Sequence, residues 1–264
     1  MPKMKRDAAC MATASDMLPD APKPWSKSRK PEGLFVLNNG IREETANSVK
    51  SFFSKSNFPW VQRFNRFPAT AHYNWWRCGP YQGEEEQHEF ANSYPEIYQL
   101  AHEAVDAMNR HLVEAEPNSS FLNFRAESVN VHLHKPNWGL GAHYDDSHDQ
   151  GNGMVLMVSL GNEGDFPENK RQPRIFRFTD PVQGYQYDVK TKNSQIILFK
   201  DECYDLWRHE SVRDKKQTGD CLSFTIRLKS IDGYENKADT GKYPKGAPFA
   251  AKMAHKRLRV LLGL

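Results

Sequence analysis

The sequence predicts an α+β protein that is mainly β, with a small helical N-terminal half and an antiparallel sandwich or barrel in its C-terminal half. Apolar residues recur at helical spacing between Ile97 and Leu112. After about residue 120 the period changes to two, and turn residues separate several short runs. The chain has 264 residues, 38% of them apolar, which is enough for one large domain with a substantial core.

The N-terminal half begins with a tail. Residues 1–32 are expected to be a flexible tail, because five prolines punctuate them and no apolar period is present. A short strand is predicted over 33–37 and a helix over 42–54. Residues 58–92 are expected to be irregular and rich in aromatic side chains. A second helix is predicted to begin with Ser93 as its N-cap and Pro95 in its first turn.

The C-terminal half is predicted to consist of strands. Candidate strands lie at 121–134, 153–160, 174–179, 185–190, 194–199, 206–211 and 221–229. We therefore expect one domain over 33–230, made of an N-terminal helical and lid layer (33–120) and a β part (121–230). Residues 231–264 form a basic C-terminal extension, which would either contact phosphates or dock its last apolar residues on the body.

Composition excludes several classes of protein. No apolar run approaches the roughly 18 residues of a membrane span, so we expect no membrane association. The four cysteines contain no CxxC pair, which argues against zinc fingers and against a disulfide scaffold. They fit an intracellular compartment, nucleus or cytoplasm, with an organelle left open. A net charge of +3 permits an anionic partner without requiring one.

A metal site is predicted from three residues. His143 and Asp145 stand two apart, so on an extended segment both side chains point to one side and can reach one ion. Such a pair arises by chance in a chain with ten histidines and 33 acidic residues, so it needs a third ligand. His209 lies several strands later. Two histidines and one carboxylate form the facial triad that leaves open positions on Fe(II).

Two of the candidate strands carry a polar face beside these ligands. In 221–229, Cys221, Ser223, Thr225 and Arg227 alternate with apolar residues, and in 129–134 Asn130, His132 and His134 do the same. These faces would either meet water or line a cavity. A buried Arg is costly unless an anion meets it, and its fork suits a carboxylate. We therefore expect Arg227 to face an anion near the metal.

Residues 123–229 resemble the AlkB-like family of Fe(II)/2-oxoglutarate dioxygenases. The resemblance is carried by SVNVHLHKPNWGLGAHYD (128–145), MVSLG (157–161), RIFRF (174–178), His209 and CLSFTIR (221–227), in the order and at the spacings of the family. It implies a double-stranded β-helix, or jelly-roll, over 121–230, with N-terminal helices and an aromatic lid loop. It also implies Fe(II), the co-substrate 2-oxoglutarate and O₂, with His143, Asp145 and His209 as iron ligands.

The resemblance places Arg227 at the second arginine of the family, which binds the co-substrate. The family's first arginine falls on Cys221 and its asparagine on Ser223, while His132 and His134 stand where the family has other co-substrate contacts. Either His132, His134 and Ser223 replace the missing cation, or another Lys or Arg reaches in, or the co-substrate binds weakly or differs.

For the substrate, three hypotheses stay open. The resemblance implies oxidative demethylation of an alkylated base in DNA or RNA, with the extruded base stacked on aromatic side chains. The candidates for this stacking are Tyr73, Trp75, Trp76 and Tyr144. The same triad would also serve a dioxygenase that acts on a protein side chain. The third hypothesis is a nucleic-acid-binding jelly-roll without turnover. We expect a monomer in each case.

Overall fold

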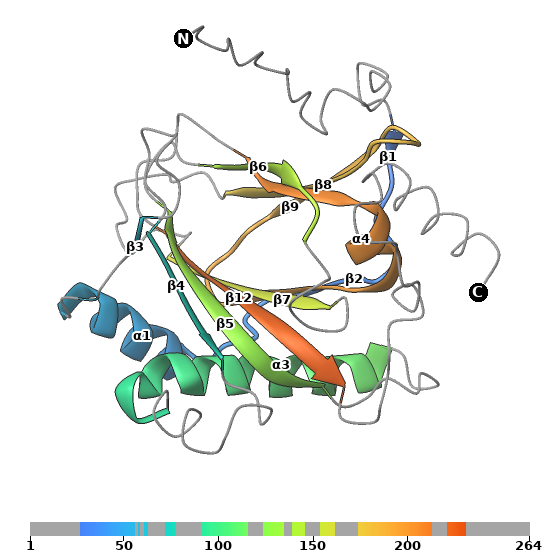
Figure 1. The fold of residues 1–264 in the computed structure, drawn as a ribbon. Helices are drawn as coiled ribbons and strands as arrows, with labels where there is room; N and C mark the ends of the chain where they lie inside the picture. The colour runs from blue at the N-terminus through green and yellow to red at the C-terminus, as the bar shows by residue number, and fades with distance from the viewer. Residues whose placement is uncertain are drawn as a thin grey trace, which may run out of the picture.

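Two β-sheets face each other in the computed structural model, and two long helices cover the outer face of the larger sheet (Figure 1). The structure describes residues 27–55, 58, 61–62, 72–77, 91–115, 124–134, 139–145, 154–161, 174–212 and 221–230. This arrangement is the jelly-roll that the sequence predicts, and the fold class is confirmed as α+β and mainly β. The predicted C-terminal extension, 231–264, lies outside the described residues.

Among the described residues, the smaller sheet has five strands. In spatial order they are β1 (Lys27–Ser28), β9 (Tyr185–Lys190), β8 (Ile175–Asp180), β11 (Arg208–Ser211) and β6 (Leu140–His143). β1 pairs with β9 in parallel, and the other neighbours are antiparallel.

The larger sheet has seven strands, all antiparallel to their neighbours. In spatial order they are β2 (Leu34–Leu37), β10 (Gln195–Phe199), β7 (Val155–Leu160), β12 (Cys221–Ser230), β5 (Phe124–His134), β4 (His72–Arg77) and β3 (Val61–Gln62). Every residue of β7 is buried, which is expected of a central strand covered on both faces.

The two long helices are α1 (Glu43–Lys55) and α3 (Pro95–Ala115). The short helix α4 (Asp201–Leu206) directly precedes β11. α3 is amphipathic, and its apolar positions recur every three or four residues and are buried. Its predicted apolar positions are confirmed as buried: Ile97, Leu100, Ala101, Ala104, Met108 and Leu112. No helix in the described part of the chain is long and apolar enough to cross a membrane.

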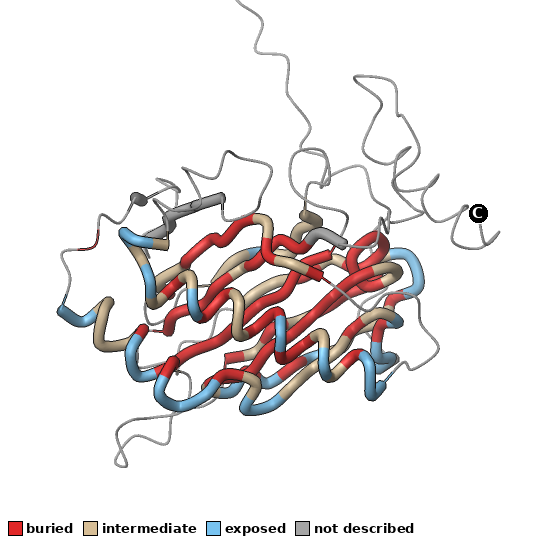
Figure 2. The backbone as a smooth tube through the Cα atoms, turned by 90° about the horizontal axis from the view of Figure 1, so that it is seen from below, coloured by how far each residue is buried: buried red, intermediate tan, exposed pale blue. Residues whose placement is uncertain are grey.

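In the described part of the chain, apolar residues form two cores. The first joins α1 and α3 to the larger sheet, and the second lies between the two sheets. Figure 2 shows buried residues running along the strands, with exposed residues at the outer turns. The helices bury the outer face of the larger sheet in the first core. Its inner face is apolar where it joins the second core and polar on β5 and β12, where it lines a cavity.

The two strands with alternating faces behave as the sequence predicts. On β12, Phe224 and Ile226 are fully buried in the core under the helices, while Ser223 and Arg227 line a cavity between the sheets. The pairing of β12 with β5 slips between Arg227 and Leu228, where Ser128 and Ala126 are the successive partners. Such a bulge adds one residue and shifts the alternation of the strand, so Ala126 also reaches the core.

Four predictions need correction. Residues 58–92 are not all irregular, because 72–77 form β4, which pairs with β5 along its whole length. The ordered chain begins before the predicted boundary at 33, since Lys27–Ser28 pairs with β9. The strand predicted over 206–211 is shorter, because α4 occupies 201–206 and β11 starts at 208. The N-cap of α3 is Tyr94 rather than Ser93, because the carbonyl of Tyr94 accepts the first helical bond, from Tyr98.

Candidate metal centre

The ends of two neighbouring strands bring the predicted ligands together. His143 is the last residue of β6, and Asp145 follows two residues later. His209 lies on β11 and is the direct register partner of His143. Side chains of register partners share a face of the sheet, and the two imidazole rings lie with centroids 4.4 Å apart.

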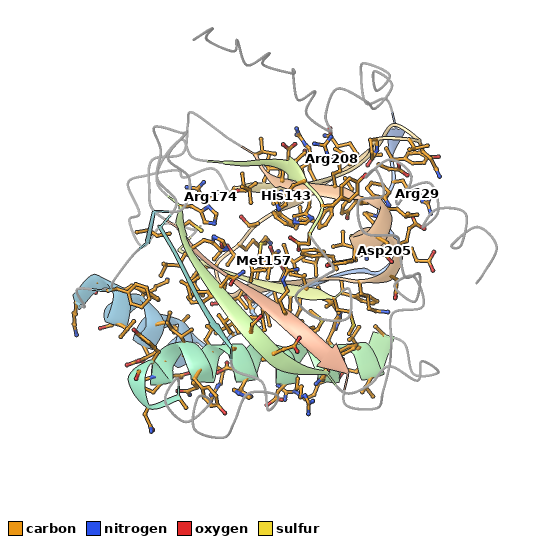
Figure 3. The ribbon with its side chains drawn as sticks, viewed as in Figure 1. Arg29, His143, Met157, Arg174, Asp205 and Arg208 are labelled. Atoms are coloured by element: carbon orange, nitrogen blue, oxygen red, sulfur yellow. The ribbon has the colours of Figure 1, made fainter. Side chains whose placement is uncertain are left out.

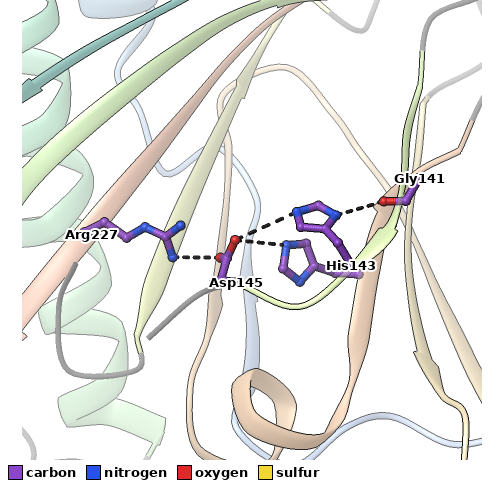
Figure 4. A network of polar contacts seen from close by, with 5 residues as sticks. Gly141, His143, Asp145 and Arg227 are labelled. Atoms are coloured by element: carbon purple, nitrogen blue, oxygen red, sulfur yellow. Dashed lines mark hydrogen bonds and ion pairs between the residues drawn. The ribbon is translucent and has the colours of Figure 1, made fainter. Parts of the chain in front are cut away.

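The carboxylate of Asp145 completes the group. Its Oδ1 lies 3.8 Å from Nε2 of His143 and 3.7 Å from Nε2 of His209 (Figure 4). The three side chains each offer one ligand atom, and these atoms all lie within 4.8 Å of one another. The structure thus brings together the three residues that the sequence predicts as a metal site.

A backbone carbonyl fixes the ring of His143. Nδ1 of His143 lies 2.8 Å from the carbonyl oxygen of Gly141. A carbonyl only accepts hydrogen bonds, so Nδ1 must carry the proton. The neutral ring then has its lone pair on Nε2, which is the atom that faces Asp145. A second partner of this kind is the usual way in which a protein sets the tautomer of a metal-binding histidine.

Arg227 holds the other oxygen of the carboxylate. Its Nη1 donates to Oδ2 of Asp145 at 2.7 Å, and the exposed fractions of the two side chains are 9% and 12% (Figure 4). Burial would raise the pKa of Asp145, but His209, Arg227 and His143 outweigh it and lower that pKa to about 2. The carboxyl is therefore ionised at neutral pH, as a metal ligand must be.

Aromatic rings surround His209. The rings of Phe199 and Phe176 lie 4.9 Å and 5.6 Å from its own ring, between centroids. Burial among them lowers the pKa of His209 to about 3, although the carboxylate of Asp145 opposes part of this shift. His209 is thus a neutral imidazole at pH 7, again the form that binds a metal.

A cavity of about 240 Å³ opens beside these ligands, between the two sheets. The residues that the sequence predicts for the co-substrate, His132, His134, Ser223 and Arg227, all line it. Nε2 of His134 and Oγ of Ser223 form a hydrogen bond of 2.6 Å. Cys221 lines the same cavity, so the position of the missing cation also faces it.

The predicted substrate residues are placed only in part. Tyr144 lies between the ligands His143 and Asp145 and is half-buried. Tyr73 and Trp75 pair with His132 and Asn130, while Trp76 pairs with Val129. The side chains of β4 lie outside the described part of the structure, so stacking of a base on Tyr73, Trp75 and Trp76 stays a prediction.

Three groups at the site have no role in the sequence analysis. Arg174, just before β8, is 4% exposed and lines the cavity (Figure 3). Arg208 donates to the carbonyl of Ala142 at 2.5 Å and so ties β11 to the strand that ends in His143. The third is the carbonyl of Gly141. For Arg174 a sequence indication existed, because it shares a strand face with Phe176 and Phe178, and an Arg on an apolar face needs an anionic or polar partner.

Fold and site together define the class: a jelly-roll protein with a two-histidine, one-carboxylate metal-binding site. The donor set is the one that non-haem Fe(II) sites use, with positions left for further ligands. A cavity that carries two guanidinium groups beside it suits an anionic ligand. The residues present therefore fit Fe(II), with 2-oxoglutarate and O₂ as co-substrates.

Comparison with known proteins supports the fold. No family model and no curated protein sequence matches the chain. The solved structure of OsALKBH1 matches with a TM-score of 0.52 and 14% identity, over 76% of this chain and 100% of that one. The chain thus has the fold of this solved structure, the jelly-roll that its resemblance to AlkB-like dioxygenases implies.

Two hydroxylase structures match less well. A Pseudomonas putida prolyl-4-hydroxylase gives a TM-score of 0.44 at 16% identity, over 74% of this chain and 92% of its own. A viral collagen prolyl hydroxylase from Paramecium Bursaria Chlorella virus-1, in complex with 2OG, gives 0.44 at 14% identity, over 75% and 97%.

Proposed function

We propose that this protein is an Fe(II)/2-oxoglutarate-dependent dioxygenase that oxidatively demethylates alkylated bases of DNA or RNA. One observation carries the proposal: two imidazole Nε2 atoms and one carboxylate oxygen converge beside a cavity that also holds buried guanidinium groups. The overall reaction consumes O₂ and 2-oxoglutarate, and it releases succinate, CO₂ and formaldehyde. The formaldehyde carries the lost N-methyl carbon, and the nitrogen regains a proton.

In this proposal His143, Asp145 and His209 hold the metal. Bound Fe(II), with 2-oxoglutarate and O₂, supplies the oxidation of a substrate C–H bond, which is the hard part of the chemistry. The chain supplies geometry. The carbonyl of Gly141 keeps Nδ1 of His143 protonated, so that Nε2 is the ligand. Arg227 keeps Asp145 ionised and oriented, because it binds Oδ2 and leaves Oδ1 toward the imidazoles.

The cavity between the sheets is the proposed site for the co-substrate. Its wall carries Arg227, His132, His134 and Ser223, the residues that the resemblance aligns with co-substrate contacts. Buried apolar side chains such as Phe199 and Val155 complete the wall and exclude water. A dry pocket would suit this reaction because it keeps water away from the substrate C–H bond that is to be oxidised.

Substrate recognition is proposed on the sequence resemblance. Tyr144, next to both metal ligands, and Tyr73 and Trp75 of β4, whose register partners His132 and Asn130 line the cavity, would stack against an extruded base. Each stacked base is worth roughly 1–3 kcal/mol. We further propose that the protein acts as a monomer in the nucleus or cytoplasm.

The test measures formaldehyde and succinate from Fe(II)-loaded protein, 2-oxoglutarate and O₂ with methylated oligonucleotides. The wild type is expected to release both products in equal amounts. His143→Ala and Asp145→Ala each remove a ligand and are expected to lower turnover at least 100-fold. Arg177→Met is the matched control, since Arg177 pairs with Asp188 outside the cavity lining.

The alternatives give distinct results. Turnover of methyl-lysine peptides but of no methylated oligonucleotide would move the substrate from nucleic acid to protein. Oligonucleotide binding without succinate release under any condition would favour a non-catalytic binding protein. Full activity of both ligand variants would show that the metal-site assignment is wrong.

A further inference from the structure

The proposed co-substrate has two carboxylates, and the structure offers a partner for each end. The metal held by His143, Asp145 and His209 would take the oxo-acid end of the co-substrate. The distal carboxylate then needs a cation inside the cavity, because a buried carboxylate without one is costly. We propose that Arg174 is the residue that binds this distal carboxylate, an inference that rests on the proposed function.

The position of Arg174 on the smaller sheet supports this role. Side chains alternate along a strand, so Arg174 points to the same side as Phe176 and Phe178. Phe178 is the register partner of the metal ligand His209. Arg174 therefore faces the interior on the same side of the sheet as His209, four residues along β8. That is about 13 Å of strand, a span that an extended Arg side chain and a metal-bound five-carbon diacid can bridge together.

Arg174 also reaches the place where the larger sheet lacks a cation. Nη2 of Arg174 lies 3.4 Å from the carbonyl oxygen of His134. His134 is the register partner of Cys221 in the β5–β12 pairing. The guanidinium thus crosses from the smaller sheet to the point of the larger sheet opposite Cys221. β12 has no cation at that position, and Arg174, just before β8, supplies one there.

The backbone holds Arg174 in this position. Its carbonyl oxygen accepts hydrogen bonds from the amide and from Oγ1 of Thr191, at 2.8 Å and 3.0 Å. Thr191 lines the same cavity and is buried, so these bonds are shielded from water. A guanidinium on a fixed backbone loses little freedom when it binds a carboxylate with two parallel hydrogen bonds.

Charge in the cavity distinguishes Arg174 from its neighbours. Among the described lining residues there are two guanidinium groups and one carboxylate, that of Asp145. Arg227 binds that carboxylate at 2.7 Å. Burial, with the nearby charge of Arg174, lowers the pKa of His134 well below its usual value, so His134 is neutral at pH 7 and supplies no positive charge. Among the described lining residues, Arg174 is the cationic group near His134 and Cys221.

The test compares two ligands that differ only at the distal end. Protein loaded with Mn(II) is titrated calorimetrically with 2-oxoglutarate and with 2-oxopentanoate, which has a methyl group in place of the distal carboxylate. The wild type is expected to bind 2-oxoglutarate at least about 30-fold more tightly. In Arg174→Met the affinity for 2-oxoglutarate is expected to fall by a similar factor, while the affinity for 2-oxopentanoate changes less than about threefold.

Two further variants complete the test. Arg177→Met, on the same strand but outside the cavity lining, is expected to bind both ligands as the wild type does. If Arg174→Met does not fold by circular dichroism, Arg174→Gln replaces it, because it removes the charge but keeps an N–H donor for the carbonyl of His134. It is expected to show the same selective loss.

Several results would overturn the inference. These are an unchanged preference for 2-oxoglutarate in the variant, equal weakening of both ligands, and equal affinity of the wild type for the two. The proposed function fails separately, if the wild type binds neither Mn(II) nor 2-oxoglutarate. Because the measurement is equilibrium binding, it does not depend on finding the oxidised substrate.

Discussion

Asp145 is the residue on which the site depends. One of its oxygens faces the two imidazoles, and the other accepts a hydrogen bond from Arg227. A carboxylate with both oxygens engaged in this way cannot rotate freely, so its direction is set before any metal arrives. Since its pKa is about 2, the carboxyl is already ionised at neutral pH and releases no proton when a metal binds. The ion pair with Arg227 offsets the free-energy cost of burying this negative charge.

The first prediction concerns that pair. Arg227→Met leaves Asp145 buried without its guanidinium, and breaking a buried pair in this way typically costs 3–5 kcal/mol. We expect the metal-free variant, measured with a chelator present, to lose about 3 kcal/mol or more in urea unfolding. Added Mn(II) should restore part of the loss, because the ion supplies positive charge to the same carboxylate.

The exposed pair Arg177–Asp188 provides the comparison. Its geometry is equally close, with hydrogen bonds of 2.8 Å and 2.9 Å, but both side chains are about a quarter or more exposed to water. Arg177→Met is therefore expected to cost less than about 1 kcal/mol. If the two variants lose the same stability, the buried pair has no special role in supporting Asp145.

Single residues could be predicted where the reason is local to one strand. The spacing of His143 and Asp145 puts both on one side of an extended segment, and the structure confirms this. Arg174 could not be assigned in the same way. Its importance follows from the carbonyl of His134, which belongs to the other sheet. How the two sheets face each other cannot be read from the sequence, so no local sequence pattern predicts a contact between them.

At the scale of elements, one acidic side chain joins the two long helices. Arg42 is the N-cap of α1, because its carbonyl accepts the first helical bond, from Ala46. Glu103 of α3 accepts hydrogen bonds from the amide of Arg42 at 2.6 Å, from its guanidinium at 3.0 Å, and from Oγ1 of Thr45 at 2.6 Å. The N-terminus of α1 is thus capped by a residue of another helix.

The second prediction is a pH-dependent loss of stability in Glu103→Gln. Burial would raise the pKa of Glu103, but the hydrogen bonds from Arg42 and Thr45 outweigh it and lower that pKa. A carboxyl with a lowered pKa stabilises the fold above its unfolded pKa and loses this contribution as the pH falls. We expect the variant to be about 1–2 kcal/mol less stable at pH 7, with the difference shrinking below about pH 4.

Urea unfolding at several pH values measures this difference. Glu114→Gln is the matched control, because Glu114 is an exposed acid on the same helix. It is expected to change stability by no more than about 0.5 kcal/mol at any pH. A loss in Glu103→Gln that persists unchanged at pH 3 would show that packing, and not the ionised carboxylate, connects α1 to α3.

Elements could be predicted where a period is clear. α3 and seven strands of the β half follow from spacings of 3.6 and two, and their bounds differ from the prediction by a few residues. β6 (Leu140–His143) is not among the predicted strands, because four residues are too short to show a period. β4 has the sequence HYNWWR, in which polar and aromatic residues alternate over only four positions before Trp76 breaks the pattern, so no sustained period identified it. What makes it a strand is the open edge of β5, with which all six residues pair.

At the scale of the whole molecule, the helices decide where the polar groups go. In a sandwich of two sheets, the facing sides usually form the core. Here α1 and α3 bury the outer side of the larger sheet, so that side carries a core of its own. Near β5 and β12 the inner side therefore does not have to form the core, and polar side chains there do not destabilise the fold. The site occupies that region.

Because of the strand order, a bound metal ion would connect two strands that are far apart in the sequence. β6 and β11 are neighbours only because the chain passes through both sheets between them, so an ion on His143 and His209 links segments far apart in sequence. The last prediction follows. A ligand that binds only the folded state at 100 times its Kd stabilises it by about 2.7 kcal/mol. For a domain of this size that raises the Tm by roughly 5–10 °C. Differential scanning fluorimetry with Mn(II) measures it. His143→Ala should abolish the shift, and an equal shift in both proteins would place the ion elsewhere.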